Sequence, residues 1–273
     1  MLKITESLTS RQNPKIKNLI RLQKHSERLE QDVFLVEGVK EIEKAVISGY
    51  EFESVYFTPA IIKPDAVKEL LGKSVPEQVY EVNNSIFNKI AYRETSGGIV
   101  VLARPKLHDL NLLSSSLSEN PLLLVIEGVE KPGNIGAIYR TADAAGVDGI
   151  ILCDSKPDLY NPNIIRASLG CVFTKPTAIT SSHNAIEWLK KKKINIYSTY
   201  LHKAVPYTTL DFTQSSAIVM GTEATGISDA WLNASDTNII IPMSGSADSM
   251  NVSTSAAVII FEARRQRNLQ NLL

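Results

Sequence analysis

Short apolar runs rich in strand-forming residues alternate with segments of helical periodicity along most of this chain. In the first third, the expected strands are 33–36, 54–57, 78–82 and 98–102. The expected helices of the same part are 13–30, 39–47, 65–71 and 85–92. Alternation of this kind forms layers in which helices cover a mostly parallel sheet. The pattern therefore predicts an α/β fold.

A second α/β series follows a break in this pattern. Residues 105–120 are rich in serine, which is typical of a linker. A continuous apolar run, Leu122–Ile126, then predicts a strand buried on both faces. A helix ending at Ala145 follows, and the later expected strands and helices are 149–152, 162–169, 185–191, 194–197, 217–220, 238–241 and 252–267. We expect two domains, 1–105 and 121–273, joined by a linker at 106–120.

The composition is that of a globular protein, with 44% hydrophobic and 21% charged residues. Cys153 and Cys171 are expected to be buried free thiols in a reducing compartment. No signal sequence and no membrane-spanning run is evident, so we expect a cytoplasmic protein. The net charge of zero argues against indiscriminate binding of nucleic acid. Residues 1–30 nevertheless carry seven Lys or Arg against three Glu.

Three loops, 130–136, 221–226 and 242–251, follow expected strands of the second series. Open α/β sheets bind ligands at this edge. The glycines Gly128 and Gly133 have the spacing of a P-loop, but Asn134 stands where its lysine is required. No dinucleotide-binding glycine pattern is present either. An NTPase and a nicotinamide or flavin enzyme are therefore disfavoured.

The four histidines lie outside these loops, and no His/Cys spacing resembles a zinc site. We expect no metal, and no serine nucleophile elbow is present. What the loops contain is glycine, small hydroxyls, amides and a few charges. Such groups suit a reaction that depends on positioning more than on acid–base chemistry. Methyl transfer from a sulfonium is such a reaction, because the leaving group departs neutral.

Four segments, in order, resemble the motifs of the SpoU (TrmH-type) RNA 2′-O-methyltransferases of the SPOUT class. Glu130–Gly146 is similar to the first motif, Ile218–Ile227 to the second, and Ile241–Ser253 to the third. Arg166–Gly170 resembles the Arg-x-Ser-x-Gly segment of the family. Met250 stands where the family usually has Leu, and Thr222 and Ala224 stand where it has Asn and Gly.

This resemblance implies a C-terminal SPOUT domain with a parallel sheet, a deep trefoil knot and a homodimer that completes the site. The N-terminal third is similar to the smaller L30e-like α/β domain that binds RNA substrates in many members. Ser10–Lys17 and Phe34–Gly38 carry that similarity. The implied cofactor is S-adenosyl-L-methionine (SAM).

The resemblance also implies roles for single residues. The implied catalytic residues are Asn134, Arg140, Glu223, Ser249 and Asn251. The implied SAM contacts are Gly221, Glu223, Ile241, Met250 and Asn251. Arg140, Arg166 and Ser168 are the candidates for binding substrate. Without the resemblance, the simplest interpretation of Asn134, Ser249 and Asn251 is that they cap helices. Glu223 would then be a carboxylate at the start of a helix, and Arg140 would be a surface arginine.

We interpret Arg140 as an electrostatic group, because a guanidinium stays protonated in proteins. Arg166 and Ser168 either contact RNA or structure their loop, and the sequence does not separate these. The expected function is methylation of a ribose 2′-hydroxyl in ribosomal RNA. The alternatives are a tRNA 2′-O-methyltransferase and a non-catalytic RNA-binding protein on a degenerate module.

Overall fold

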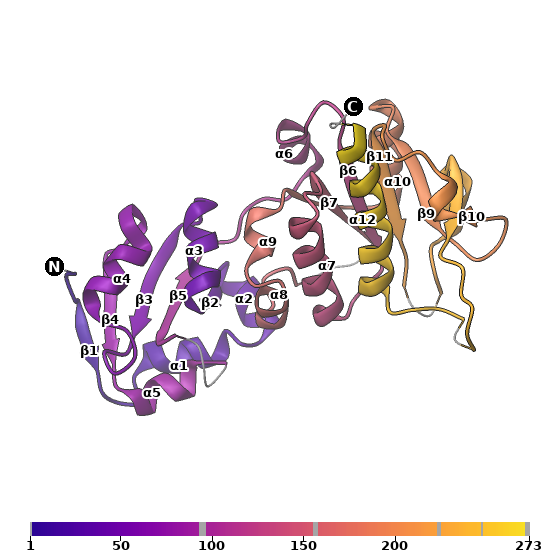
Figure 1. Ribbon diagram of the computed structural model, residues 1–273. Coiled ribbons are helices and arrows are strands. Elements are labelled where there is room, and N and C mark those ends of the chain that lie inside the picture. Colours follow the sequence, from indigo (N-terminus) through magenta and orange to yellow (C-terminus); the bar gives the residue numbers. More distant parts are fainter. Residues whose placement is uncertain (1, 93–96, 155–157, 223–224, 247, 271–273) are drawn as a thin grey trace. The chain divides into compact units, whose positions relative to one another are not determined.

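The computed structural model divides the chain into two compact units (Figure 1). Unit 1 comprises Met1–Leu107 and Asp158–Thr174, and unit 2 comprises His108–Pro157 and Lys175–Leu273. The structure describes residues 2–92, 97–154, 158–222, 225–246 and 248–270. Each unit has its own sheet and its own buried core. Within the described residues, no helix has the length and apolarity that crossing a membrane requires.

Unit 1 is built on a five-stranded sheet of order β1-β4-β3-β5-β2. Its strands are β1 (Glu6–Leu8), β2 (Phe34–Glu37), β3 (Phe52–Phe57), β4 (Gln78–Val82) and β5 (Ile99–Ala103). Its helices are α1 (Pro14–Arg21), α2 (His25–Gln31), α3 (Val39–Ile47), α4 (Pro64–Leu71), α5 (Asn84–Ile90), α8 (Pro162–Ala167), α9 (Cys171–Thr174) and the short 3₁₀ helix Gly72–Ser74. Figure 1 shows α3 and α4 on one face of this sheet and α1 and α5 on the other.

The alternation of side chains along the strands explains these two layers. On β3, Tyr56 joins a cluster with α1 and α5 residues such as Leu19 and Phe87. Its neighbours Val55 and Phe57 are fully buried but lie outside that cluster. Successive side chains of a strand point to opposite faces, so both faces of this sheet are apolar and covered.

Two expectations for this part of the chain are corrected. The strand β5 pairs antiparallel with both β2 and β3, so this sheet is mixed rather than mostly parallel. A strand buried on both faces has the same apolar pattern in either direction. The expected helix 13–30 is divided into α1 and α2, because Lys24 adopts an extended conformation between them. The strand β1 was not predicted from its sequence.

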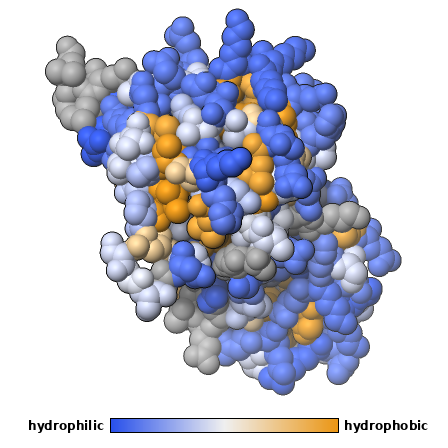
Figure 2. All heavy atoms as spheres, turned by 90° about the vertical axis from the view of Figure 1, so that its right-hand side faces the viewer, coloured by the Kyte–Doolittle hydropathy of each residue, from blue (hydrophilic) through white to orange (hydrophobic). Residues whose placement is uncertain are grey.

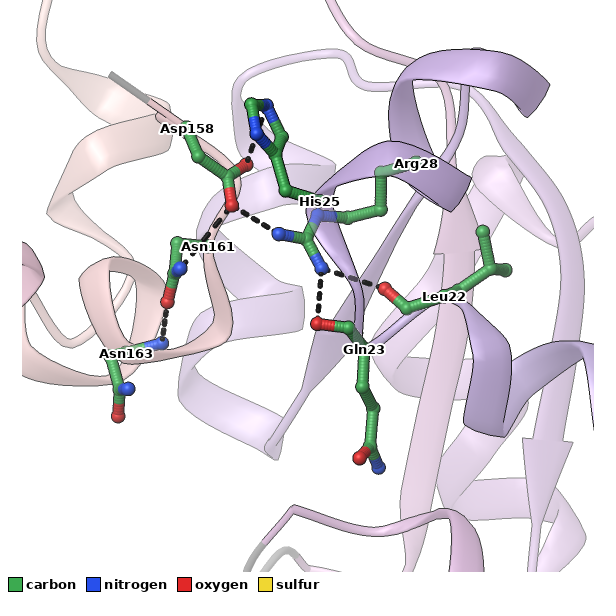
Figure 3. Close-up of polar contacts among 7 residues, drawn as sticks. All are labelled: Leu22, Gln23, His25, Arg28, Asp158, Asn161 and Asn163. Carbon is green, nitrogen blue, oxygen red and sulfur yellow. Dashed lines mark hydrogen bonds and ion pairs between the residues drawn. The ribbon is translucent and has the colours of Figure 1, made fainter. Parts of the chain in front are cut away.

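Residues 158–174 pack with unit 1, although the predicted division placed them in the second domain. The ring of Tyr160 stacks on Phe34 with 4.0 Å between centroids, and Phe173 packs edge-on to Tyr50. The Nζ of Lys44 donates to the carbonyl of Leu169. Arg28 forms a buried ion pair with Asp158, drawn in Figure 3. These aromatic and charged contacts account for the difference.

Unit 2 is built on a seven-stranded sheet of order β10-β12-β9-β11-β6-β7-β8 in which every pair is parallel. Its strands are β6 (Leu122–Glu127), β7 (Gly149–Cys153), β8 (Thr177–Thr180), β9 (Asn195–Thr199), β10 (Val205–Pro206), β11 (Ser216–Met220) and β12 (Thr237–Ile240). Its helices are α6 (Leu110–Ser115), α7 (Pro132–Ala144), α10 (Ser182–Lys191), α11 (Asp229–Ala234), α12 (Val252–Gln270) and the 3₁₀ helix Tyr207–Thr209.

The expected parallel sheet is confirmed in unit 2, and the predicted strands agree with the observed ones within one or two residues. The central strands β6 and β11 are buried along their whole length, as a sheet with two covered faces requires. The helix α6 lies within the expected linker. Its Leu113 is buried, and a Cβ added to Gly149 would overlap that leucine. Part of the serine-rich segment therefore belongs to the core.

Candidate functional site

The loops that follow β6 and β11 meet at the carboxyl edge of the unit 2 sheet. These strands are hydrogen-bonded neighbours, with Ile126 opposite Met220 at their ends. A Cβ added to Gly128 would lie 3.0 Å from Cγ2 of Thr222. The left-handed φ of Gly128, 65°, also favours glycine. Gly128, two residues before the first predicted loop, thus lies against the second loop.

The loop after β11 is a tight backbone turn. The amide and carbonyl of Thr222 pair with those of Gly226, with both N···O distances at 3.0 Å. A Cβ on Gly221 would overlap the carbonyl group of Gly226. The Thr222 hydroxyl also accepts from the Thr225 amide at 2.9 Å. Glycine at 221 is therefore required for the backbone pairing between Thr222 and Gly226.

A buried carboxylate, Glu127 at the end of β6, holds this turn in place. Its Oε2 accepts from the Ser228 amide at 2.7 Å, and its Oε1 accepts from the Ser228 hydroxyl at 2.6 Å. The hydroxyl of Ser182 donates to Oε1 at 3.0 Å and accepts from the Trp231 indole at 2.7 Å. Sequence reasoning missed Glu127, whose signal is a charged residue that ends an otherwise apolar strand.

We expect Glu127→Ala to lower the free energy of unfolding by about 3 kcal/mol. The substitution removes a charged acceptor and leaves buried donors on Ser228 and Ser182 unpaired. Urea denaturation followed by circular dichroism measures the change. Glu130→Ala removes an exposed carboxylate three residues later and serves as the control. Equal stabilities of the two variants would contradict a structural role for Glu127.

Cys153 is fully buried beside this carboxylate. Burial, with the nearby charges of Asp154 and Glu127, raises the pKa of the Cys153 thiol to about 12. The thiol is therefore neutral in the folded protein. Since the thiolate is the reactive form, Cys153 is expected to be inert near neutral pH.

A thiol assay with Ellman's reagent tests this expectation. Native protein at pH 8 should react slowly, because Cys153 and Cys171 are both buried. Unfolded protein should release two equivalents at once. The raised pKa also predicts that stability falls as the pH rises from the ordinary thiol value near 9 toward 12. Rapid labelling of Cys153 in the native state would contradict its burial.

Asn134 and Asn251 join the first and third loops. The Nδ2 of Asn251 donates to Oδ1 of Asn134 at 3.1 Å. The Oδ1 of Asn251 accepts from the amide and hydroxyl of Ser253 at 2.9 and 2.6 Å, which is a cap at the start of α12. Asn134 does not cap α7, since the N-cap position is Lys131. Two of the expected catalytic residues are therefore in direct contact.

Arg140 lies in the second half of α7 and is exposed. Its guanidinium forms no ion pair or hydrogen bond with the residues that the structure describes. A solvated arginine of this kind is available to an anionic substrate. A phosphate group is the ligand that its planar donors suit best.

Three of the remaining expected residues of unit 2 lie in or next to the third loop. Ser249 is exposed, with Oγ 3.5 Å from Oδ1 of Asp248. Ile241 and Met250 are half-buried at the two ends of the loop. Glu223 lies outside the described residues, as does the departure at Ala224.

Arg166 and Ser168 belong to unit 1. Ser168 is fully buried, and its hydroxyl donates to the Ile165 carbonyl at 3.0 Å. This geometry favours the loop-structuring interpretation for Ser168. Arg166 is exposed on α8, and its Nη2 donates to Oδ1 of Asn163 at 3.4 Å. The described residues contain no group of three or more metal-ligating side chains close enough to hold an ion.

Comparison with known families decides the classification. Residues 121–261 match the model of the SpoU rRNA Methylase family. The chain belongs to this family. Residues 13–101 match the MRM3-like substrate binding domain, which confirms the expected substrate-binding domain before the methylase module. The resemblance stated from the sequence motifs is thereby confirmed.

Several curated relatives and solved structures cover most of the chain. The 23S rRNA (guanosine(2553)-2′-O)-methyltransferase of Bacillus subtilis is 28% identical over 95% of this chain and 99% of its own. The 23S rRNA (guanosine-2′-O-)-methyltransferase of Neisseria meningitidis is 33% identical over 77% of this chain and 86% of its own. The crystal structure of an AdoMet-bound rRNA methyltransferase from Sinorhizobium meliloti has a TM-score of 0.84 at 29% identity. The match covers 95% of this chain and 97% of that one. The expected fold class is confirmed.

Proposed function

We propose that this protein transfers a methyl group from SAM to a ribose 2′-hydroxyl of ribosomal RNA. The hydrogen bond between Asn134 and Asn251 carries the proposal, because it joins two motifs that lie over a hundred residues apart. Both relatives described above are named as 23S rRNA 2′-O-methyltransferases. The family membership and the contact between the loops support the same activity.

The carboxyl edge of the unit 2 sheet fits SAM. A Cβ added to Gly133, Gly226 or Gly245 would meet no atom within 4 Å, so there is open space beside the backbone at one glycine of each loop. Backbone of this kind suits a polar nucleoside. Bound SAM supplies an electrophilic methyl group on a sulfonium. The residues that we expect to hold it are Gly221, Glu223, Ile241, Met250 and Asn251.

Arg140 serves this reaction by charge. Its guanidinium stays protonated, so it stabilises negative charge that develops on the 2′-oxygen and contacts a neighbouring phosphate. Asn134, held by Asn251, orients the reacting groups. Ser249 and Glu223 complete the proposed catalytic set. The proposed work of these residues is positioning and electrostatic stabilisation.

We further propose a homodimer that completes the site. Apolar side chains are exposed at the surface of the molecule among hydrophilic ones (Figure 2). Phe261 on α12 of unit 2 is 50% exposed. Exposed apolar groups of this size mark interfaces when they form a patch. We also propose that the C-terminal segment forms a trefoil knot and that the protein is located in the cytoplasm.

A methylation assay tests the proposal. Methyl-labelled SAM is incubated with the protein and, separately, with ribosomal and transfer RNA transcripts. The expected result is label in ribosomal RNA. Label in transfer RNA alone would show that the substrate is transfer RNA instead. Calorimetric titration with SAM runs in parallel. Absence of both binding heat and label would instead indicate a non-catalytic RNA-binding protein.

A further inference from the structure

The buried carboxylate Glu127 is not among the residues proposed to bind SAM or to act in methyl transfer. It ends β6 and is 7% exposed. Its two oxygens accept from three donors, which are the Ser228 amide, the Ser228 hydroxyl and the Ser182 hydroxyl. A buried charge costs free energy unless hydrogen bonds of this kind compensate it. Because the donors come from two different parts of the chain, they hold the carboxylate in one orientation.

Ser228 connects Glu127 to the loop after β11. It is exposed, so burial does not fix its place. It is also the N-cap residue of α11, a position at which serine usually accepts a bond from its own helix. Among the described residues, its hydroxyl accepts no such bond and donates to Glu127 instead. The bonds to Glu127 thus take the place of a helix cap and fix the start of α11.

A short chain of contacts links Ser228 to the expected cofactor contact on this loop, Gly221. Ile227, next to Ser228, is 5% exposed and belongs to the apolar core of unit 2. A Cβ added to Gly221 would overlap Gly226 and would lie 2.5 Å from the Ile227 nitrogen. The backbone of Gly221 therefore packs directly on the segment that Ser228 anchors.

The other side of the carboxylate is also held. Ser182, 5% exposed at the start of α10, donates its hydroxyl to Glu127 and accepts from the Trp231 indole at 2.7 Å. The Ser182 amide donates to both carboxylate oxygens of Asp154 at 3.1 Å. Trp231 is fully buried in α11. Side chains from α10 and α11 thereby fix where Glu127 points.

We infer that Glu127 is a positioning residue for the cofactor, which holds the loop after β11 in the conformation that binds SAM. It acts through Ser228 and not through contact with SAM. The inference rests on the proposed function, since it assumes that SAM binds this loop. Ligand affinity falls in proportion to the fraction of molecules that have the binding conformation. A loop that is anchored in advance avoids the cost of ordering it on binding.

Calorimetric titration with two ligands tests the inference. Glu127→Ala should weaken SAM binding about 10-fold or more, because loss of the charged acceptor frees the loop. S-Adenosylhomocysteine, the product that lacks the charged sulfonium, should lose affinity by the same factor, since it carries the same adenosine. A loss confined to SAM would identify Glu127 as a counter-charge for the sulfonium and would overturn the positioning role.

Glu127→Gln keeps the shape of the side chain without its charge. The carboxamide oxygen can accept from the Ser228 amide, and the amide group can donate to the hydroxyls of Ser228 and Ser182, which have lone pairs to accept. We therefore expect this variant to recover most of the affinity that Glu127→Ala loses, for both ligands. A SAM affinity as low as that of Glu127→Ala would contradict an action through hydrogen bonds.

Ser228→Ala tests the route by which Glu127 acts. The substitution removes the hydroxyl bond and keeps the amide bond, so it should weaken SAM binding measurably in the wild-type background. In the Glu127→Ala background it should have no further effect, because the partner of the hydroxyl is already absent. Additive losses in the double variant would show that the two residues act separately.

Thr177→Val is the matched control for a loss of stability alone. Thr177 is 5% exposed at the start of β8, at the opposite edge of the sheet from the loops. Its hydroxyl is hydrogen-bonded to that of Tyr139 at 2.9 Å, and valine of similar shape removes this contact. Urea denaturation measures the stability of each variant, and circular dichroism establishes that each is folded. The SAM affinity of Thr177→Val should equal the wild-type value.

Wild-type affinity for SAM in Glu127→Ala would overturn the inference. Methyl transfer to ribosomal RNA by the wild-type protein would then leave the proposed function intact. Equal losses of SAM affinity in Glu127→Ala and Thr177→Val would also overturn the inference, because affinity would then follow stability alone. A wild-type protein that binds no SAM would contradict both the inference and the proposed function.

Discussion

Arg140→Ala is expected to slow methyl transfer by at least ~100-fold, the usual effect of removing one donor that stabilises developing negative charge. Affinity for SAM should remain nearly intact, because Arg140 is exposed on α7 and takes no part in the loops after β11 and β12. Single-turnover assays with ribosomal RNA measure the rate, and calorimetry measures SAM binding. Arg140→Lys keeps the charge but loses the planar donors, and it should recover only part of the rate.

Lys190→Ala provides the charge-matched control. Lys190 is exposed in the last turn of α10, which leads into the start of β9 and so lies at the opposite edge of the sheet from the loops. Its substitution should leave the transfer rate within the error of the assay. Equal losses of SAM binding and turnover in Arg140→Ala would instead show that Arg140 is a structural residue.

Gly221→Ala is expected to abolish measurable SAM binding and, with it, methyl transfer. A Cβ at this position would overlap the carbonyl group of Gly226, so the backbone pairing between Thr222 and Gly226 would have to open. Overlap with backbone is not relieved by rotating a side chain. The proposed cofactor surface consists of this backbone. Calorimetric titration with SAM measures the loss directly.

Thermal denaturation of Gly221→Ala separates a local effect from general loss of folding, and Gly133→Ala is the matched control. A Cβ at position 133 would meet no atom within 4 Å, and alanine favours the first turn of α7. Its thermal stability should equal or exceed that of the wild type. If Gly221→Ala binds SAM with wild-type affinity, the loop after β11 does not form the cofactor surface.

Much of the fold could be predicted because buried strands and amphipathic helices leave clear patterns. The run Leu122–Ile126 and the helix at 39–47 are examples. Short elements were missed where the pattern is weak, as for β1 and for the two-residue β10. The direction of the strands in unit 1 could not be predicted either, since a strand buried on both faces is a continuous apolar run in a parallel and in an antiparallel sheet.

The three loops of the candidate site could be predicted because parallel strands end at one edge of a sheet. The contact between Asn134 and Asn251 could not, since nothing in either segment specifies a partner so distant in sequence. Glu127 was missed for a related reason. Its role depends on Ser228 and Ser182, which reach it from two other parts of the chain.

The same limit applies to residues 158–174. Tyr160 and Phe173 stand within the range 121–273 that the sequence assigned to the second domain. Their partners Phe34 and Tyr50 are more than a hundred residues earlier. Only the folded chain shows that Arg166 belongs with the substrate-binding unit.

The position of the transferred methyl group tests the central claim most directly. Ribosomal RNA labelled by the protein and methyl-labelled SAM is hydrolysed in alkali. A methylated 2′-oxygen cannot attack the adjacent phosphodiester, so label on ribose remains in alkali-resistant dinucleotides. We predict that all the label appears there. Label on bases, released in ordinary mononucleotides, or no label despite SAM binding, would contradict the assignment of a ribose 2′-O-methyltransferase.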